Sequence, residues 1–552
     1  MWRDWRLFIP KTVTVLKQGY RLADFRHDTL AGLTVAIVAL PLAMALAIAS
    51  GATPQAGLIT AVIAGFLISA LGGSRFQIGG PTGAFVVIVY GVIASQGYDG
   101  LLMATLMAGA ILIVAGIARI GTLIKYIPDP VTTGFTTGIA TIILASQIKD
   151  FLGLTAAKVP ADFLPKIQAL WQARATLSLP TLGLAAGCLA AIWLLRRYAP
   201  KVPGFLIVTV AAALLVMGLK LPVETIGTRF GGVPSTFPTP NLHFWSWAKA
   251  QAVLPSALTI ALLAGVESLL SAVVADQMTG RRHRSNMELV AQGVANLASA
   301  AFGGLPATGA IARTATNIRS GARSPIAGMM HAAFLLAFML LLAPMMKFVP
   351  LAALAAILVV VAINMAEMHR FRVILGTSHG DRAVLLATFG LTVLVDLTVA
   401  IEVGMVLAAF VFMHRMSKLT TVEGGRPLIE GDEDDFSRRE ARYERYEPER
   451  GDTSVITFRG PLFFGSASTL KDTLDQIGER KKHYVLRLDE VPMIDPTGAF
   501  ALGSFIEQLR RDGASVTLAG ASAHVVEQLR RSIDAHILDQ VEFADALPVK
   551  AA

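Results

Sequence analysis

Residues 302–317 read FGGLPATGAIARTATN, which places two glycines, a proline and an arginine inside a chain that is otherwise almost continuously apolar. A related stretch, IGGPTGAF, occupies residues 78–85 and repeats the order Gly-Gly, Pro, Thr-Gly-Ala. Glycine and proline interrupt regular secondary structure, so two such interruptions in apolar surroundings need a structural or functional reason. The two stretches form a matched pair.

The sequence around this pair has the composition of a membrane protein. Of its 552 residues, 54% are hydrophobic and 16% are charged, and the mean hydropathy is +0.59. From about residue 29 to about residue 416, the chain carries apolar runs that are long enough to cross a hydrocarbon core of roughly 30 Å as helices of about 20 residues. The sequence after about residue 430 has the composition of a soluble domain.

Glycine, proline and charged residues divide the apolar region into about fourteen segments. These segments begin near residues 29, 54, 81, 100, 131, 176, 203, 251, 287, 307, 325, 350, 382 and 397. The loops after even-numbered segments carry most of the Lys and Arg, whereas the short loops after odd-numbered segments carry almost none, Lys347 being the exception. By the positive-inside rule, both termini are expected in the cytoplasm.

The short segments are the third and the tenth, and they contain the two opening stretches. Matching members at these positions indicate two repeats of seven segments, and an odd number per repeat inverts the second copy in the membrane, which is a transporter architecture. Each short segment is expected to start near the midplane with free backbone N–H groups, so two facing helix starts would form an anion site. The alternative is that the glycines only allow helices to pack closely.

Two charged residues lie within the apolar segments. Glu267 is central in the eighth segment, LTIALLAGVESLLSAVVAD, and Arg313 lies about one turn into the tenth. We interpret Arg313 as positive charge behind the anion and Glu267 as the group that couples transport to a proton, with Ser271 four residues further along the same helix face. The alternative is a buried ion pair between Glu267 and Arg313 that only holds two helices together.

Several function classes find no support in the sequence. There is no Gly-x-x-x-x-Gly-Lys-Ser/Thr phosphate loop and no His-Glu-x-x-His motif, and Cys188 is the only cysteine. We therefore expect no catalytic residues, no metal and no cofactor, and the protein is not expected to be an enzyme. The net charge is +9, and the Lys and Arg side chains are distributed among the loops as expected for a membrane protein. Nucleic acid is therefore not an expected partner.

The tail reads as a small α/β domain. TSVITFRGPLFFGSA and YVLRLDEVPMID predict strands, ALGSFIEQLRRDG and VVEQLRRSI predict helices, and VTLAG predicts another strand. The sequence before it, EGDEDDFSRREARYERYEPERG, is dense in charge and is interpreted as a solvated linker. The expected parts of the chain are a cytoplasmic segment (1–28), a transmembrane domain (29–418), this linker (419–451) and the tail domain (452–552).

The chain resembles the SulP family of anion transporters, also called SLC26, over nearly its whole length. The resemblance is carried by residues 32–51, by GGPTGAFVVI at 79–88, by the run at 266–328, and by a tail similar to STAS domains. It implies a core domain of segments 1 to 4 and 8 to 11, a gate domain of segments 5 to 7 and 12 to 14, a homodimer, and elevator-like movement of core against gate. In STAS regulators a phosphorylated serine follows an aspartate, whereas here Asp495 and Pro496 precede Thr497, which favours a structural loop.

The resemblance also implies which residues hold the anion. These are Pro41 and Leu42, then Thr82, Gly83, Ala84 and Phe85, and then Gly309, Ala310, Ile311, Ala312 and Arg313. In sodium-coupled bicarbonate members an aspartate and a threonine stand where this chain has Glu267 and Ser271, so the departure favours protons.

The sequence therefore predicts an all-α polytopic membrane protein, a seven-plus-seven inverted repeat with a small cytoplasmic STAS domain, in a bacterial inner membrane. The expected function is proton-coupled transport of a C4-dicarboxylate, sulfate or bicarbonate. The expected partners are the anion, protons, membrane lipids, a second copy of the chain and a cytoplasmic protein that binds the STAS domain. The alternatives are a passive anion channel or exchanger, and a membrane sensor that signals through its tail.

Overall fold

The computed structural model describes residues 7–122, 128–156, 159–199, 202–422, 426–427, 452–465 and 481–544. The chain divides into two compact units, Met1–Met405 and Val406–Ala552, and each is described by itself. The predicted linker at 419–451 lies largely outside the described residues.

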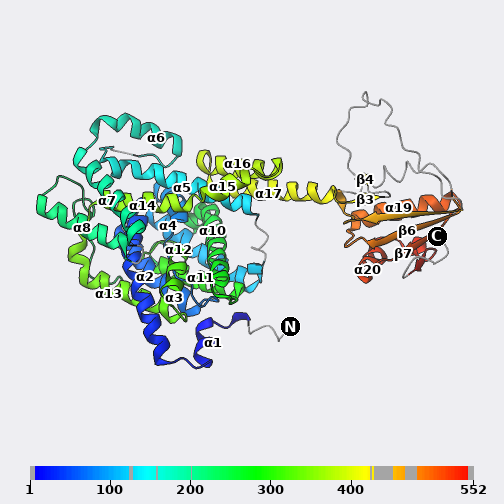
Figure 1. The fold of residues 1–552 in the computed structure, drawn as a ribbon, viewed down its shortest axis with the longest axis horizontal. Coiled ribbons are helices and arrows are strands. Elements are labelled where there is room, and N and C mark those ends of the chain that lie inside the picture. The colour runs from blue at the N-terminus through cyan, green and yellow to red at the C-terminus, as the bar shows by residue number, and fades with distance from the viewer. Residues whose placement is uncertain are drawn as a thin grey trace. The chain divides into compact units, whose positions relative to one another are not determined.

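The first unit is helical (Figure 1). Its helices, together with the helix that runs into the second unit, are α1 (Lys11–Lys17), α2 (Leu22–Ala49), α3 (Pro54–Leu71), η2 (Gly83–Phe85), α4 (Val86–Ile117), α5 (Asp129–Leu152), α6 (Phe163–Gln172), η4 (Ala173–Thr176), α7 (Leu179–Tyr198), α8 (Gly204–Leu219), α9 (Ile226–Phe230), α10 (Trp247–Thr279), α11 (Ser285–Ala301), α12 (Ile311–Arg319), α13 (Ile326–Met346), α14 (Leu351–Met365), α15 (Met368–Leu375), α16 (His379–Leu394) and α17 (Leu397–Ser417). Its two strands are β1 (Gly79–Gly80) and β2 (Thr308–Gly309).

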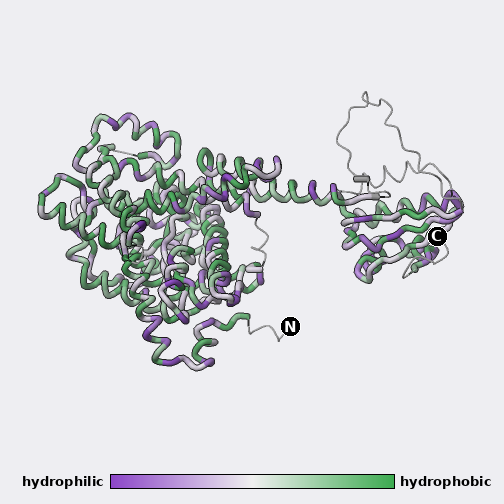
Figure 2. Tube along the Cα trace, viewed as in Figure 1, coloured by the Kyte–Doolittle hydropathy of each residue, from purple (hydrophilic) through white to green (hydrophobic). Residues whose placement is uncertain are grey.

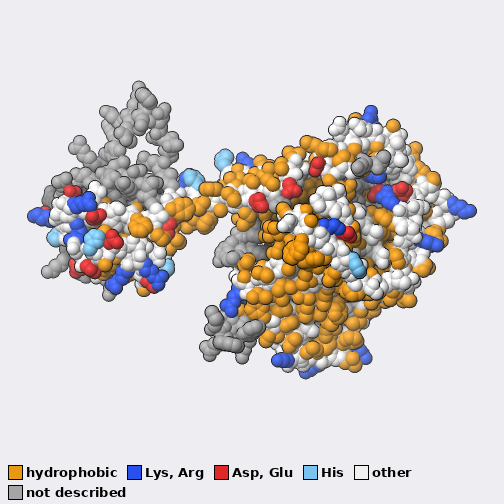
Figure 3. All heavy atoms as spheres, turned by 180° about the vertical axis from the view of Figure 1, so that it is seen from behind, with side chains coloured by type: hydrophobic (Ala, Val, Ile, Leu, Met, Phe, Trp, Pro, Cys, Tyr) orange, Lys and Arg blue, Asp and Glu red, His pale blue; other side chains and the backbone are white. Residues whose placement is uncertain are grey.

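The helices agree with the predicted segments. Each of the fourteen expected segments overlaps a helix, and the third and fourth both fall on α4, where Gly97 has a non-helical φ of 72° and divides the helix. Among the described residues, nine helices are long and apolar enough to cross a membrane. Hydrophilic stretches gather at helix ends and turns (Figure 2), and hydrophobic side chains cover a broad area of one face (Figure 3). The first unit is therefore a multi-pass membrane domain.

The helices of this domain form two groups. In the first group α4 packs along α10 and α11, α2 packs along α3 and α13, and α12 lies against α10 and α2. In the second group α5 packs along α14 and α16, and α7 packs along α14 and α8. This grouping agrees with the expected core and gate.

Small residues bring the core helices close together. A Cβ at Gly109 of α4 would lie 2.7 Å from the carbonyl oxygen of Gly293 in α11, and a Cβ at Gly293 would lie 2.5 Å from that of Gly109. Both distances are shorter than real contacts, so the two backbones touch only because neither residue has a side chain. Glycine thus serves close helix packing at this pair, which lies outside the two opening stretches.

The second unit contains a six-stranded sheet in the order β4-β3-β5-β6-β7-β8. Its elements after α17 are β3 (Thr421–Val422), β4 (Arg426–Pro427), β5 (Thr453–Arg459), β6 (His483–Glu490), α19 (Pro496–Arg511), β7 (Ser515–Ala519), α20 (Ala523–Ser532), α21 (Ala535–Leu538) and β8 (Glu542–Ala544). Strands β5 to β8 are parallel, and β3 pairs antiparallel with β4 and β5. Apolar residues of the sheet and of α19 and α20 form one core. The predicted small α/β domain is confirmed.

Thr497 does not lie in a loop, as the sequence suggested, but in the first turn of α19. Asp495 caps this helix, since its carboxylate accepts hydrogen bonds from the N–H groups of Gly498 (2.7 Å) and Phe464 (2.9 Å). Pro496 occupies the first helical position, where its missing N–H costs nothing.

Candidate functional site

The two opening stretches cross between the core helices as extended chain and pair with each other. Gly79 pairs with Gly309 and Gly80 with Thr308 in an antiparallel register. The N–H of Ala310 also donates to the carbonyl of Ile78 at 2.8 Å. A helix follows each strand: η2 and α4 come after β1, and α12 comes after β2. Because the strands run in opposite directions, these helices start on opposite sides of the pair.

Side chains of α10 and α12 hold the beginning of the first crossing segment. Gln77 donates to the hydroxyl of Ser268 at 2.7 Å, and the N–H of Ile78 donates to the hydroxyl of Thr314 at 3.1 Å. The amide of Asn317 donates to the carbonyl of Phe76 at 2.9 Å. Extended backbone at this depth has no water to bond, so these polar side chains take the place of solvent.

The second crossing segment is held mainly by α11. Asn296 accepts from the N–H of Ala307 at 2.8 Å and donates to its carbonyl at 2.9 Å, so one side chain satisfies both backbone groups of that residue. Ser299 donates to the carbonyl of Leu305, and Thr60 accepts from the Leu305 N–H, both at 2.6 Å. Sequence reasoning missed Asn296. Its signal is one of several polar side chains in the ninth apolar segment, together with Glu288 and Gln292.

Both helix starts lack a side-chain cap. The N-cap of η2 is Thr82 and that of α12 is Ala310, and neither makes a capping hydrogen bond. The first N–H groups of any helix have no partner within the helix, and here they carry the positive ends of two helix dipoles. Gly83, Ala84 and Phe85 are buried, whereas Ile311 and Ala312 are exposed at the start of α12. The arrangement can bind an anion.

The Thr82 hydroxyl does not cap η2 because it points to α10. It donates to the carboxylate of Glu267 at 2.8 Å, and both side chains are half-buried. The predicted proton group is therefore tied directly to one helix start. Ser271, which the helix periodicity places on the same face as Glu267, bonds instead to the hydroxyl of Thr314 at 3.1 Å.

Arg313 is only 3% exposed and reaches behind the first crossing segment. Its Nη2 donates to the carbonyl of Pro81 at 2.9 Å, while Nε and Nη1 are buried without a hydrogen-bond partner in the described part of the chain. Gly80 has a φ of 150°, which favours glycine, and a Cβ there would lie 2.6 Å from Nη1. Within the described ranges no ion pair links Arg313 to Glu267, so the alternative of a pair that only locks two helices is not formed.

Pro41 and Leu42 are buried in the middle of α2, the helix that packs against α12. Proline has no N–H, so the carbonyl one turn earlier in α2 loses its usual partner at this depth. The break in the hydrogen-bond pattern of α2 thus falls at the two residues that the family resemblance assigned to the anion site.

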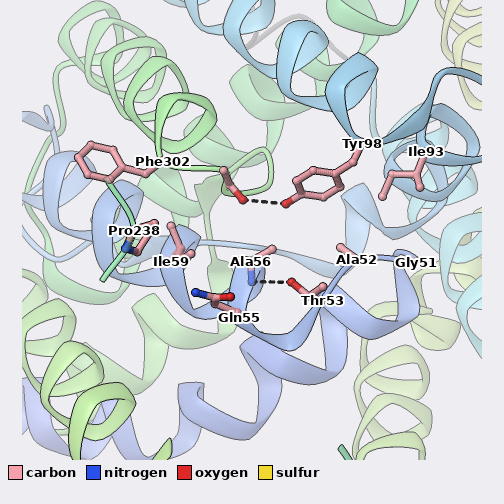
Figure 4. Close-up of a pocket in the computed structure, with 11 residues that line it drawn as sticks. Gly51, Ala52, Thr53, Gln55, Ala56, Ile59, Ile93, Tyr98, Pro238 and Phe302 are labelled. Carbon is pink, nitrogen blue, oxygen red and sulfur yellow. Dashed lines mark hydrogen bonds between the residues drawn. The ribbon is translucent and has the colours of Figure 1, made fainter. Parts of the chain in front are cut away.

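A cavity lies elsewhere in the same unit. It has a volume of about 440 Å³ and is lined by residues of the turn after α2, of α3 and α4, and of the turn after α11 (Figure 4). Tyr98 spans its edge and donates to the carbonyl of Gly303 at 2.7 Å. None of the predicted site residues lines it. In the described part of the chain, no three or more His, Cys, Asp or Glu side chains are grouped to hold a metal ion.

Comparison with known families gives two matches. Residues 25–388 match the Sulfate permease family, and residues 447–545 match the STAS domain. The chain is 38% identical over 532 residues to the "Putative sulfate transporter YvdB" of Bacillus subtilis, covering 96% of this chain and 97% of the relative. It is 31% identical over 520 residues to the "Bicarbonate transporter BicA" of Picosynechococcus, covering 92% and 91%.

Solved structures show the same architecture. The transmembrane domain of a cyanobacterial BicA, at 31% identity, covers 69% of this chain and 98% of that chain with a TM-score of 0.63. Murine Slc26a9 in the inward-facing state covers 98% and 93% with a TM-score of 0.85, and its 17% identity makes this a likeness of fold.

Proposed function

Because this chain belongs to the sulfate permease family, we propose that it is a secondary active transporter that moves a small anion together with a proton. The candidate substrates are sulfate, bicarbonate and a C4-dicarboxylate. Two relatives carry the names of sulfate and bicarbonate transporters, which supports an inorganic anion. On this proposal the protein performs no chemistry on its substrate and uses an ion gradient as its energy source.

The single observation that carries the proposal is the position of Arg313. A buried guanidinium with two unpartnered nitrogens lies behind two uncapped helix starts, so the region has more positive charge and more donors than the protein itself satisfies. Buried polar groups in proteins normally have partners, and an anion would supply them. Positive ends of helices and one arginine would accept planar, tetrahedral or extended anions, so the shape of the binding site would set the choice.

The hydrogen bond between Thr82 and Glu267 supports coupling to protons. An ionised Glu267 repels an anion held at the start of η2, and in a medium of low dielectric constant this repulsion is strong. Protonation removes that repulsion, so proton and anion each favour binding of the other, and the effect is reciprocal. The Ser271 hydroxyl is engaged by Thr314, which supports a proton at Glu267 over a sodium ion.

The two groups of helices support an elevator-like mechanism. The crossing segments, Arg313 and Glu267 all belong to the core group, so a bound anion would move with the core while the gate stays fixed. We further propose a homodimer with both termini in the cytoplasm of a bacterial cell. The tail would then regulate transport, by binding a cytoplasmic protein, without forming part of the pathway.

A substrate panel in proteoliposomes tests this function. Uptake of labelled sulfate, bicarbonate and succinate should be measured with and without an inward proton gradient, together with counterflow of labelled against unlabelled anion. The proposal predicts gradient-driven accumulation of one of these anions and counterflow with a bounded turnover. Conductance without counterflow would indicate a channel, and the absence of both activities with all three anions would indicate a sensor.

A further inference from the structure

Four basic side chains gather at one end of the core helices, away from the crossing segments. We call Lys11, Arg75, Arg281 and Arg284 the basic cluster. They come from three separate parts of the chain, namely α1, the turn between α3 and β1, and the connection between α10 and α11. Figure 1 shows α1 beside the ends of α2 and α3.

Backbone contacts bring these parts together. The N–H of Lys11 donates to the carbonyl of Gly72 at 2.9 Å, and the N–H of Arg284 donates to that of Gly73 at 3.0 Å. Arg75 follows two residues later in the same turn and donates to the side chain of Gln18, just beyond α1. Arg284 donates to the hydroxyl of Thr14 at 3.0 Å. The cluster is thus fixed by the fold.

Only part of the positive charge of the cluster is offset, since Asp276 acts on Lys11 with a sign opposite to that of the three arginines. The Lys11 ammonium and the Arg281 guanidinium have no hydrogen-bond or ion-pair partner within the described ranges. The Asp276 carboxylate contacts the His283 ring at 2.7 Å, and the buried Glu288 carboxylate accepts hydrogen bonds from the N–H groups of Gly73 and Ser74. Burial, followed by Arg284 and Arg75, lowers the pKa of Lys11, and burial, followed by Arg281 and Arg284, lowers the pKa of Arg75. The cations therefore repel one another.

Apolar side chains are exposed at the same end of the core. Val13 and Leu16, three residues apart on α1, are 38% and 55% exposed, and Leu22 at the start of α2 is 70% exposed. A short helix with exposed apolar side chains and flanking lysines is typical of a segment that lies in the membrane interface. A free phosphate ion would use the cations only, whereas a phospholipid would use both features.

We propose that the basic cluster binds the phosphate of an anionic phospholipid, whose acyl chains lie against Val13, Leu16 and Leu22. The bound headgroup would link α1, the turn after α3 and the connection between α10 and α11, three parts that otherwise bring like charges together. This proposal does not depend on the transported anion or on proton coupling. It identifies a lipid site on the core that is separate from the crossing segments.

The test is a lipid titration of the full chain followed by native mass spectrometry. Lys11→Gln combined with Arg281→Gln removes the two cations without described partners. The apparent affinity for phosphatidylglycerol should fall roughly tenfold to thirtyfold, because each basic residue near an anionic surface contributes roughly fivefold to the affinity. The matched control, Arg319→Gln with Arg372→Gln, removes two exposed cations outside the cluster and outside α1, and should leave the affinity within about twofold. Phosphatidylcholine should bind weakly to every variant.

Further arms separate the possible outcomes. Leu16→Ser should weaken phosphatidylglycerol binding with all cations intact, which a site for free phosphate would not. Displacement of the lipid by millimolar inorganic phosphate, or an equal loss in the control variant, would overturn the proposal. So would unchanged binding in the cluster variant. If the double variant does not fold, each single variant should show part of the same loss.

Discussion

The two crossing segments are paired strand to strand, yet they are built differently. The first carries no charge, and Thr82 uses its hydroxyl to bond Glu267 on a neighbouring helix. The second carries Arg313 two residues into its helix, and its N-cap, Ala310, has no polar side chain. One half of the repeat thus contacts Glu267, the proposed proton-coupling group, and the other half supplies the charge of Arg313. The difference suggests that the halves of an inverted repeat divide coupling and binding between them.

The largest expected effect concerns how each segment is held. Asn296→Leu leaves the buried N–H and carbonyl of Ala307 without partners, which should cost about 2–6 kcal/mol of stability at about 1–3 kcal/mol for each group. Asn317→Leu, the matched variant for the first segment, removes the hydrogen bond from α12 to Phe76 and should cost about 1–3 kcal/mol. Thermal unfolding of both variants in the same detergent measures the difference. An equal or larger loss for Asn317→Leu would show that the segments do not differ in this way.

The next effect concerns the fixed charge. Arg313→Ala should weaken anion binding by about 1.5–3 kcal/mol, which is roughly tenfold to more than a hundredfold in affinity, because a charged hydrogen-bond partner is lost. Arg313→Lys should restore part of the affinity, since it keeps the charge without the planar fork. Substrate affinity and melting temperature should be measured for each variant and for each combined with Glu267→Gln. Unchanged affinity, with a stability loss that Glu267→Gln repairs, would mean that Arg313 is a structural partner only.

A smaller effect distinguishes the two threonines. Thr82→Val removes the hydrogen bond to Glu267 and should slow proton-driven uptake by about threefold to tenfold, whereas Thr82→Ser should preserve it, given about 0.5–1.5 kcal/mol for one such bond. Thr308 donates to the carbonyl of Ala264 at 2.7 Å, so Thr308→Val should lower the melting temperature and leave coupling intact. If Thr308→Val uncouples transport and Thr82→Val does not, the assigned roles are reversed.

The smallest effect is expected from the tail. Its strands form a sheet with its own hydrophobic core, and none of the site residues belongs to it. A chain that ends at Glu430 should therefore bind the anion within about twofold of the full chain, because no charge or donor of the site is lost. Binding should be measured on monodisperse protein. A folded, monodisperse truncation that no longer binds would mean that the tail contributes to the site.

Much of the candidate site could be proposed from the sequence because membrane burial makes polar residues conspicuous. Glu267 and Arg313 are detectable as charges in apolar segments, and the two short Gly/Pro stretches are detectable as interruptions. The spans of the helices follow from hydropathy for the same physical reason. These features depend on local sequence and on the thickness of the bilayer alone.

The register of the pair could not be predicted. The recurrence of Gly-Gly equates Gly79 and Gly80 with Gly303 and Gly304, but the strand opposite β1 is Thr308–Gly309. Gly303 has a φ of 74° and follows the end of α11, so its glycine serves a helix end and not the crossing strand. The same residue type meets two different backbone needs, and the sequence does not distinguish them.

Partners across helices were also beyond the sequence. Periodicity places Ser271 on the face of Glu267, but it does not say that Thr314 lies opposite, and the hydroxyl bonds there. Likewise, Glu288 lies at the predicted start of the ninth segment. It is nevertheless fully buried and accepts hydrogen bonds from Gly73, Ser74 and Gln292. These contacts depend on how distant segments pack, which no local pattern encodes.

The central claim is that protonation of Glu267 couples the gradient to the anion. The most direct test is uptake by Glu267→Gln in proteoliposomes under an inward proton gradient, with Glu402→Gln, an exposed carboxylate of α17, as the matched control. The account predicts that Glu267→Gln retains counterflow of labelled anion but no longer accumulates it when the gradient is applied, while Glu402→Gln behaves as the unmodified chain. Accumulation by Glu267→Gln in response to the pH gradient alone would contradict the account.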